Sequence, residues 1–145
     1  MKLGQAFYLT AEQLAKTNSE ASLRSSVSRA YYGVFHEARE LIVDEVGVVF
    51  GKTTTSVHTQ LPRCLMQSQD RFLVAAGRAL DDLRDTRNEA DYDASSKNFK
   101  STKFIEFQLA KAKKAIENIS SCDREAIREI IRNYASNILK LTLSN

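Results

Sequence analysis

The chain has 145 residues, of which 43% are hydrophobic and 27% are charged, so its size and composition are those of one folded, soluble domain. It contains only five glycines and one proline, which argues against a turn-rich all-β sandwich or barrel and favours long helices. The net charge of +3 is too small to indicate a nucleic-acid-binding protein by itself. The two cysteines, Cys64 and Cys122, form neither a disulfide framework nor a metal-ligand pattern.

No targeting or membrane-spanning segment is expected. Residues 1–8 lack the long apolar run and the small-residue cleavage site of a secretory signal. Nowhere do ~18 apolar residues follow one another, as a membrane-spanning helix requires. Together with the unpaired cysteines, this favours a cytoplasmic protein that does not contact a membrane.

Apolar residues recur at steps of three and four along most of the chain, which predicts five or six helices and no strand. These helices are expected at about 3–16, 22–45, 57–67, 71–89, 102–119 and 123–141. Residues 46–56, with two glycines and three consecutive threonines, are predicted to form a loop, as is the polar stretch 91–101. The apolar run 48–50 is too short, and has no partner run, to make a sheet. The fold class expected for 1–145 is therefore a single all-α domain, an up-and-down helical bundle with short connections.

The helix at 22–45 has two ordered faces. Asn18 or Ser19 can cap its start with a side-chain oxygen. One face is an apolar stripe suited to a bundle interior: Leu23, Val27, Ala30, Tyr31, Val34, Phe35, Ala38, Leu41 and Ile42. The other face is also regular, but polar: Ser25, Ser28, Arg29, Tyr32, His36 and Arg39. One bundle core can bury only one face, so we expect a homodimer through this helix and the one at 71–89; the alternative is a solvated face.

The apolar stripe on the helix at 71–89 ends in a charge. Its apolar residues recur up to Leu83 and predict another apolar residue at position 87, where the sequence has Arg87. A buried guanidinium needs a partner, and Asp91, four residues later, is the nearest candidate. Two interpretations follow: the pair is a structural ion pair at the bundle end, or Arg87 faces a phosphate in a cleft.

Charge is unevenly distributed around Arg87. Six acidic residues lie between positions 81 and 93, and six lysines against one acid lie between positions 97 and 114. Acidic neighbours repel phosphate unless they are paired, so the lysines of the following helix are expected to compensate.

Neither a metal site nor a cofactor is predicted. The only histidines, His36 and His58, form no metal-ligand spacing with cysteines or carboxylates. The glycines at positions 47 and 51 lack the strand that precedes a phosphate-binding loop.

Three segments closely resemble motifs of the HEPN superfamily, in particular of its small stand-alone prokaryotic members. Residues 25–39 read Ser-Ser-Val-Ser-Arg-Ala-Tyr-Tyr-Gly-Val-Phe-His-Glu-Ala-Arg and are similar to its second-helix signature. Residues 56–61 resemble the segment that opens its third helix, and residues 87–93 contain the Arg-x-x-Ala-Asp-Tyr motif that ends its fourth. The three matches follow the family's order and cover about 22–119, so the helix at 123–141 lies outside the resemblance.

This resemblance implies an up-and-down bundle, usually a homodimer, with a role in prokaryotic stress, toxin–antitoxin or anti-phage systems. A minimal nucleotidyltransferase is often the partner, and in related toxins it adenylylates a tyrosine near the motif. Many members are metal-independent ribonucleases in which an arginine, followed within two helical turns by a histidine, meets its counterpart from a second subunit in one cleft.

Carried over to this chain, Arg87 matches the motif arginine and Asn88 the polar residue after it. Asp91 stands where a histidine would, and no histidine follows position 58. Aspartate, with a pKa of ~3.9, is a weaker base near neutral pH than histidine, so His36 or His58 would have to come near Arg87 to move protons. Tyr92 directly follows Asp91; its alternative role is to pack at the helix end on the tyrosines at positions 31 and 32.

We therefore expect a HEPN-like metal-independent ribonuclease or toxin component that acts on RNA from a dimer cleft. The expected catalytic residues are Arg87, Asp91 and His36. The expected RNA- or nucleotide-contacting residues are Ser28, Arg29, Tyr32, His58, Asn88 and Tyr92. The alternatives are a non-catalytic HEPN-like module that binds nucleotide, RNA or a partner protein, and a helical dimerisation adaptor.

Overall fold

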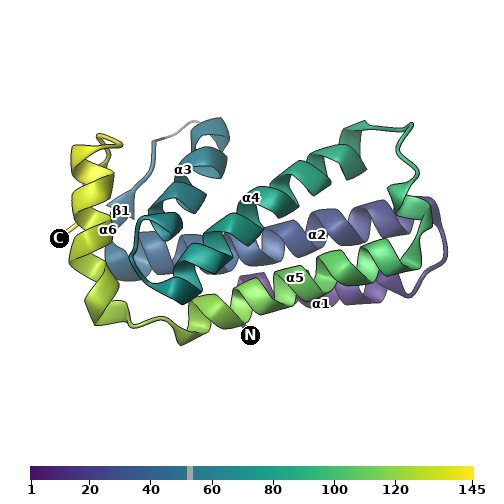
Figure 1. Ribbon diagram of the computed structural model, residues 1–145, viewed down its shortest axis with the longest axis horizontal. Helices are drawn as coiled ribbons and strands as arrows, with labels where there is room; N and C mark the ends of the chain where they lie inside the picture. Colours follow the sequence, from purple (N-terminus) through teal and green to yellow (C-terminus); the bar gives the residue numbers. More distant parts are fainter. Residues whose placement is uncertain (52–53) are drawn as a thin grey trace.

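The computed structural model describes residues 1–51 and 54–145, and over these residues the chain is an all-α bundle, as predicted (Figure 1). A π-helical turn, η1 (Glu40–Val46), continues the second helix, and a 3-10 turn, η2 (Asn98–Lys100), precedes the fifth. The α-helices in the described residues are α1 (Leu3–Ala15), α2 (Glu20–Arg39), α3 (Thr54–Met66), α4 (Arg71–Tyr92), α5 (Thr102–Ser121) and α6 (Arg124–Asn137). Each lies where the periodicity predicts a helix.

Helix α2 is the central element, and α1, α4 and α5 pack along it. In Figure 1, α1, α2 and α5 follow the long axis of the molecule, α4 crosses them diagonally, and α6 stands across one end. All nine residues of the apolar stripe predicted on the helix at 22–45 are buried. None of the described helices is both long enough and apolar enough to cross a bilayer.

Both ends of the helix predicted at 22–45 agree with the structure to within about two residues, but its last turns are π-helical. Ser19 caps the helix, because its Oγ accepts a hydrogen bond from the backbone N–H of Ser22 at 3.1 Å. After Arg39 the helix widens into η1 and ends at Gly47, whose φ of 88° lies in the left-handed region. A Cβ at Gly47 would also lie 2.7 Å from a guanidinium nitrogen of Arg132 and would displace the end of that side chain.

The prediction that the chain has no strand is wrong at one place. Val48 and Val49 form a short strand, β1, that pairs antiparallel with β2 (Thr142–Leu143) near the C-terminus. Arg132 fixes this pairing, because its Nη1 donates to the carbonyl oxygens of Val46 (3.0 Å) and Ser144 (2.9 Å). The partner strand follows α6, almost a hundred residues later, so the local pattern could not reveal it. The loop predicted at 46–56 is shorter than expected, because α3 begins at Thr54. Positions 52 and 53 of this loop lie outside the described residues.

Helix α6 packs on the bundle. Ile127 and Ile131 are buried, and the helix contacts η1 and α3. Ile138, which follows the last residue of the helix, is 66% exposed.

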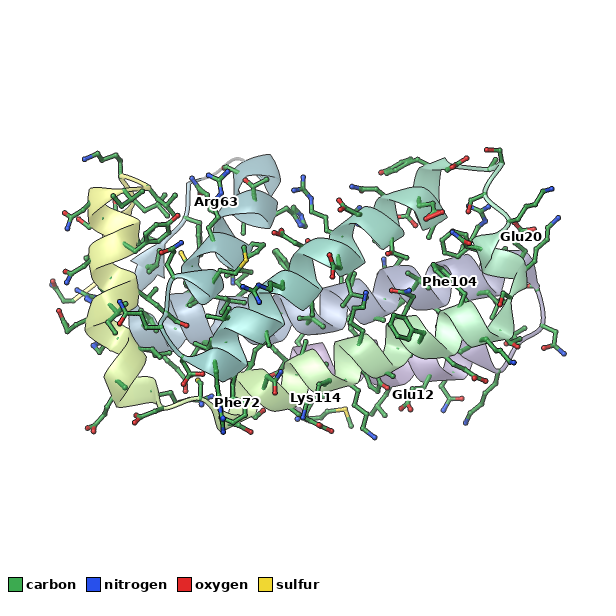
Figure 2. The ribbon with its side chains drawn as sticks, in the orientation of Figure 1. Glu12, Glu20, Arg63, Phe72, Phe104 and Lys114 are labelled. Carbon is green, nitrogen blue, oxygen red and sulfur yellow. The ribbon has the colours of Figure 1, made fainter. Side chains whose placement is uncertain are left out.

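Helix α4 continues to Tyr92, three residues beyond its predicted end, and Arg24 of α2 holds that end in place. The Nη1 of Arg24 donates to the carbonyl oxygens of Ala90 and Asp93, both at 2.9 Å. Its guanidinium also lies 4.7 Å from the ring centroid of Phe99 in η2 and donates to Glu20, which lies at the same end of the bundle (Figure 2). These contacts satisfy carbonyl groups that a helix end leaves without partners and thereby order the segment predicted as the loop 91–101.

Helices α1 and α2 approach each other closely at two glycines. A Cβ on Gly4 would lie 2.6 Å from the carbonyl oxygen of Gly33, and one on Gly33 would lie 3.0 Å from the carbonyl oxygen of Gly4. The buried side chain of Glu37 fills the remaining space beside Gly4. Along the same contact, Ser26 donates to the carbonyl oxygen of Ala11 at 2.7 Å.

The variant Gly4→Ala should lower the free energy of unfolding by about 1–3 kcal/mol, because the backbones of α1 and α2 must move apart to accept the methyl group. Urea denaturation followed by circular dichroism measures this change. Gly51→Ala is the matched control, since no atom lies within 4 Å of a Cβ built there. Equal effects of the two substitutions would contradict the close approach.

Candidate functional site

Arg87 lies on α4 with its guanidinium over two tyrosines of α2. The guanidinium carbon is 5.2 Å from the ring centroid of Tyr31 and 5.6 Å from that of Tyr32. The Arg87 side chain is 13% exposed, and its Nη1 lies 3.7 Å from Oδ2 of Asp91. The predicted pair of Arg87 and Asp91 is therefore present, but the Asp91 side chain is 31% exposed, so its charge stays partly hydrated.

The polar face of α2 meets Arg87 through Asp91. Ser28 donates to Oδ2 of Asp91 at 3.4 Å, and Nη2 of Arg29 donates to the Ser28 hydroxyl at 3.3 Å. The guanidinium of Arg29 also lies 5.2 Å from the ring centroid of Tyr32. Thus the structure brings together five of the residues predicted from the polar face and the motif, with two guanidinium groups over the ring of Tyr32.

His58 joins this group from α3. Its Nδ1 shares a short hydrogen bond with the hydroxyl of Tyr31, and its ring stacks on Phe35 with the centroids 4.7 Å apart. Tyr31 therefore contacts both Arg87, through its ring, and His58, through its hydroxyl.

Burial, together with nearby arginines in the case of His58, keeps these groups in defined protonation states. Burial lowers the pKa of His58, and the charges of Arg87 and Arg84 lower it further, so the imidazole is neutral at pH 7. Burial raises the pKa of Tyr31 well above its usual value, so its hydroxyl keeps its proton. A neutral imidazole beside a protonated hydroxyl can move protons near neutral pH.

His36, the other histidine, lies in a different environment on α2. Its ring packs against Phe7 of α1 with a centroid distance of 4.9 Å. Burial lowers the pKa of His36, and the cations that lower it further are Arg39 and Arg29 rather than Arg87. Helix α1 thus covers part of the polar face that the sequence left open for a second copy.

Within the part of the chain that the structure describes, the side chains of the other two motif residues, Asn88 and Tyr92, form no hydrogen bond, ion pair or ring contact with Arg87 or the tyrosines of α2. Tyr92 is 79% exposed, so the expectation that it packs on the tyrosines of α2 is wrong. The side chain lies at the last residue of α4, where it lines a shallow hollow with Glu20 and Arg24. Asn88 is half-buried on α4.

Several acidic residues near Arg87 are already engaged. Glu89 accepts hydrogen bonds from Ser96 (2.7 Å) and Asn98 (2.8 Å). Asp82 pairs with Lys111 of α5 at 3.9 Å, as expected from the lysines of that helix. Pairing reduces the repulsion that these carboxylates exert on an approaching phosphate.

Two residues of the site carry more than the sequence indicated. Tyr31 was assigned to the apolar stripe, although a tyrosine hydroxyl in a core requires a polar partner, and that requirement was the available signal. Arg24 was not singled out, yet it fixes the end of α4 that carries Asp91. Among the described residues, no group of three His, Cys, Asp or Glu side chains is arranged to hold a metal ion.

No protein-family model matches the chain, and no curated protein or solved structure is significantly similar to it.

The variant Arg87→Leu should raise the pKa of His58 and leave that of His36 unchanged. Removing a nearby cation makes protonation of the imidazole less costly, so the pKa moves up toward the ordinary value of ~6.5. An NMR titration of the two histidine rings measures both values in one sample. Arg39→Leu is the matched control, for which only the pKa of His36 should rise.

Proposed function

We propose that this chain is a HEPN-like ribonuclease that cleaves RNA without a metal ion, from a cleft between two copies of the chain. The observation that carries the proposal is the placement of two guanidinium groups, those of Arg29 and Arg87, over the ring of Tyr32. The resemblance of residues 87–93 to the HEPN motif selects Arg87 independently.

A phosphate group fits this arrangement of cations. Guanidinium groups present planar pairs of donors that match phosphate oxygens, and Nε of Arg87 is buried without a hydrogen-bond partner. The contacts of Asp91 with Ser28 (3.4 Å) and Arg87 (3.7 Å) are longer than the ~2.7–2.9 Å of a strong charge-assisted hydrogen bond. A phosphate can therefore compete with the partly exposed carboxylate of Asp91 for Arg87, and with the Ser28 hydroxyl for Arg29.

His58, in place of His36, is the proton-transfer group of the proposed site. In RNA cleavage the 2′-oxygen attacks the adjacent phosphorus as it loses its proton, and the departing 5′-oxygen gains one. The hydrogen bond to Tyr31 engages Nδ1 of His58, so Nε2 is the atom assigned to the substrate. Nε2 is a base in the tautomer in which Nδ1 donates to Tyr31, and the imidazolium formed when Nε2 takes the 2′ proton can then give that proton to the departing 5′-oxygen.

A homodimer would bring two such sites together. The polar face of α2 lies between α1 and the end of α4, and Ser25 on that face is exposed. Pairing two copies through α2 and α4 would place both copies of Arg87 along one RNA backbone, as the resemblance to HEPN proteins implies. A toxin–antitoxin or anti-phage role, with a nucleotidyltransferase-type partner, belongs to the same proposal, and the exposed hydroxyl of Tyr92 is an accessible acceptor for such an enzyme.

One observation favours a second candidate, a HEPN-like module that binds RNA or a nucleotide without cleaving it. Asp91 contacts Arg87 and stands at the position of the motif histidine, so the motif itself supplies no imidazole for proton transfer. In this second function, Arg87 holds a phosphate and no bond is cleaved. Binding without turnover would identify this function.

Incubation of the protein with labelled single-stranded RNA in EDTA tests the proposal. The wild-type chain should produce fragments that end in 2′,3′-cyclic phosphate. Arg87→Lys and His58→Gln should each reduce the rate by ~100-fold or more, the usual scale for loss of a positioned acid–base group or transition-state contact. Arg78→Lys, an exposed arginine of α4, is the control and should cleave normally. Full activity of a folded Arg87→Lys protein would overturn the assignment of the site.

An NMR titration with 3′-uridine monophosphate tests the role of His58 without relying on turnover. A phosphate dianion bound by Arg87 should raise the pKa of His58 and leave that of His36 unchanged, because the anion stabilises the nearby imidazolium. Arg87→Leu should abolish the response. Cleavage of RNA without any response of His58 would contradict its role, whereas absence of both cleavage and response would contradict the ribonuclease proposal.

A further inference from the structure

A second surface feature, a groove between α4 and α5, takes no part in the proposed ribonuclease site. It encloses about 370 Å³ and shares none of its lining residues with the group around Arg87. We call it the α4–α5 groove, and its lining residues are Ala75, Ala79, Phe107, Ala110, Lys111, Lys114, Ala115 and Asn118. Figure 2 shows Lys114 on α5.

The lining of this groove combines exposed apolar surface with an unused polar group. Phe107 is 62% exposed, so a large apolar side chain faces solvent at this groove. Asn118 is only 7% exposed and lines the groove, yet its side-chain amide makes no hydrogen bond within the described residues. The polar atoms of this amide are open to the groove, so a ligand that supplies a donor or acceptor can replace the water that meets them.

The edges of the groove are positively charged. Lys111 and Lys114 line it directly, and Nζ of Lys111 lies 5.2 Å from the ring centroid of Phe107. Arg78, next to Ala79 on α4, and Lys103, one turn before Phe107 on α5, are exposed on the same two helices. Asp82 is paired with Lys111. Asp85 and Glu106 are exposed acids on the same two helices, but they do not line the groove.

We propose that the α4–α5 groove binds an acidic amphipathic helix of a protein partner. Leucine-sized side chains of such a helix cover the alanine floor and Phe107, its acidic side chains pair with the lysines at the edges, and a polar group meets Asn118. This is the general geometry in which a helix lays its apolar face in a groove and charge complementarity selects the partner.

Charge and shape disfavour the other occupants. A second copy bound symmetrically would bring the lysines of one α5 against those of the other, and like charges across an interface are unfavourable. RNA would satisfy the lysines, but its phosphates would leave the apolar floor and Phe107 in contact with a charged backbone.

Fluorescence anisotropy with the full chain and a labelled synthetic peptide tests the proposal. The peptide carries leucine along one helical face and glutamate elsewhere, and a scrambled peptide of the same composition is its control. The patterned peptide should bind at least about tenfold more tightly than the scrambled one, which corresponds to ~1.4 kcal/mol. Ala110→Glu, at an exposed position of the floor, should weaken binding of the patterned peptide by at least about tenfold, because it places a negative charge against the apolar and acidic side chains of the peptide.

Two neighbouring lysines provide a matched pair of variants. Lys114→Glu should weaken binding of the patterned peptide several-fold, whereas Lys113→Glu, which faces α1 on the other side of α5, should not. Equal effects of the two, or equal binding of both peptides, would show nonspecific attraction and overturn the proposal. Two further results with Ala110→Glu would also overturn the proposal. A change in sedimentation mass would identify a second copy of the chain as the occupant, and a loss of RNA binding would identify RNA.

Discussion

The candidate site depends on one buried side chain, Tyr31. Its ring lies in the core of the bundle, beneath the guanidinium of Arg87, and its hydroxyl holds His58. A cation over an aromatic face gains roughly 0.5–2 kcal/mol, which offsets part of the cost of placing Arg87 in an apolar stripe. The same residue thus fixes a cation from α4 and an imidazole from α3 against α2.

The scaffold around Tyr31 is held by close contacts at both ends of α2. The backbones of α1 and α2 touch at Gly4 and Gly33, which fixes the position of Phe7 against the polar face. At the other end of the site, Arg24 binds the last carbonyl groups of α4 and holds the turn that carries Asp91. Catalytic or binding groups need such support, because small displacements of a cation or base cost much of its effect.

Helix α4 divides the molecule into two surfaces of different chemistry. Toward α2 and α3 it presents Arg87 to aromatic rings and to a neutral imidazole, a setting suited to a phosphate. Toward α5 it presents alanines beside exposed lysines, a setting suited to an acidic helix. Both proposed ligands are anionic, so the uncharged surface beside the cations determines which ligand each surface selects. Aromatic rings lie beside Arg87, and alanines lie beside the lysines of the groove.

The sequence by itself determined the positions of the helices, the buried stripe of α2 and the pairing of Arg87 with Asp91, because each depends on residues three or four apart along one helix. Only the tertiary structure decided that His58, and not His36, lies with Arg87, since they belong to different helices and meet through Tyr31. It alone paired Val48 and Val49 with the strand after α6, and turned Tyr92 to solvent. Contacts between distant segments depend on how the helices pack, and the periodicity of a single helix carries no information about its neighbour.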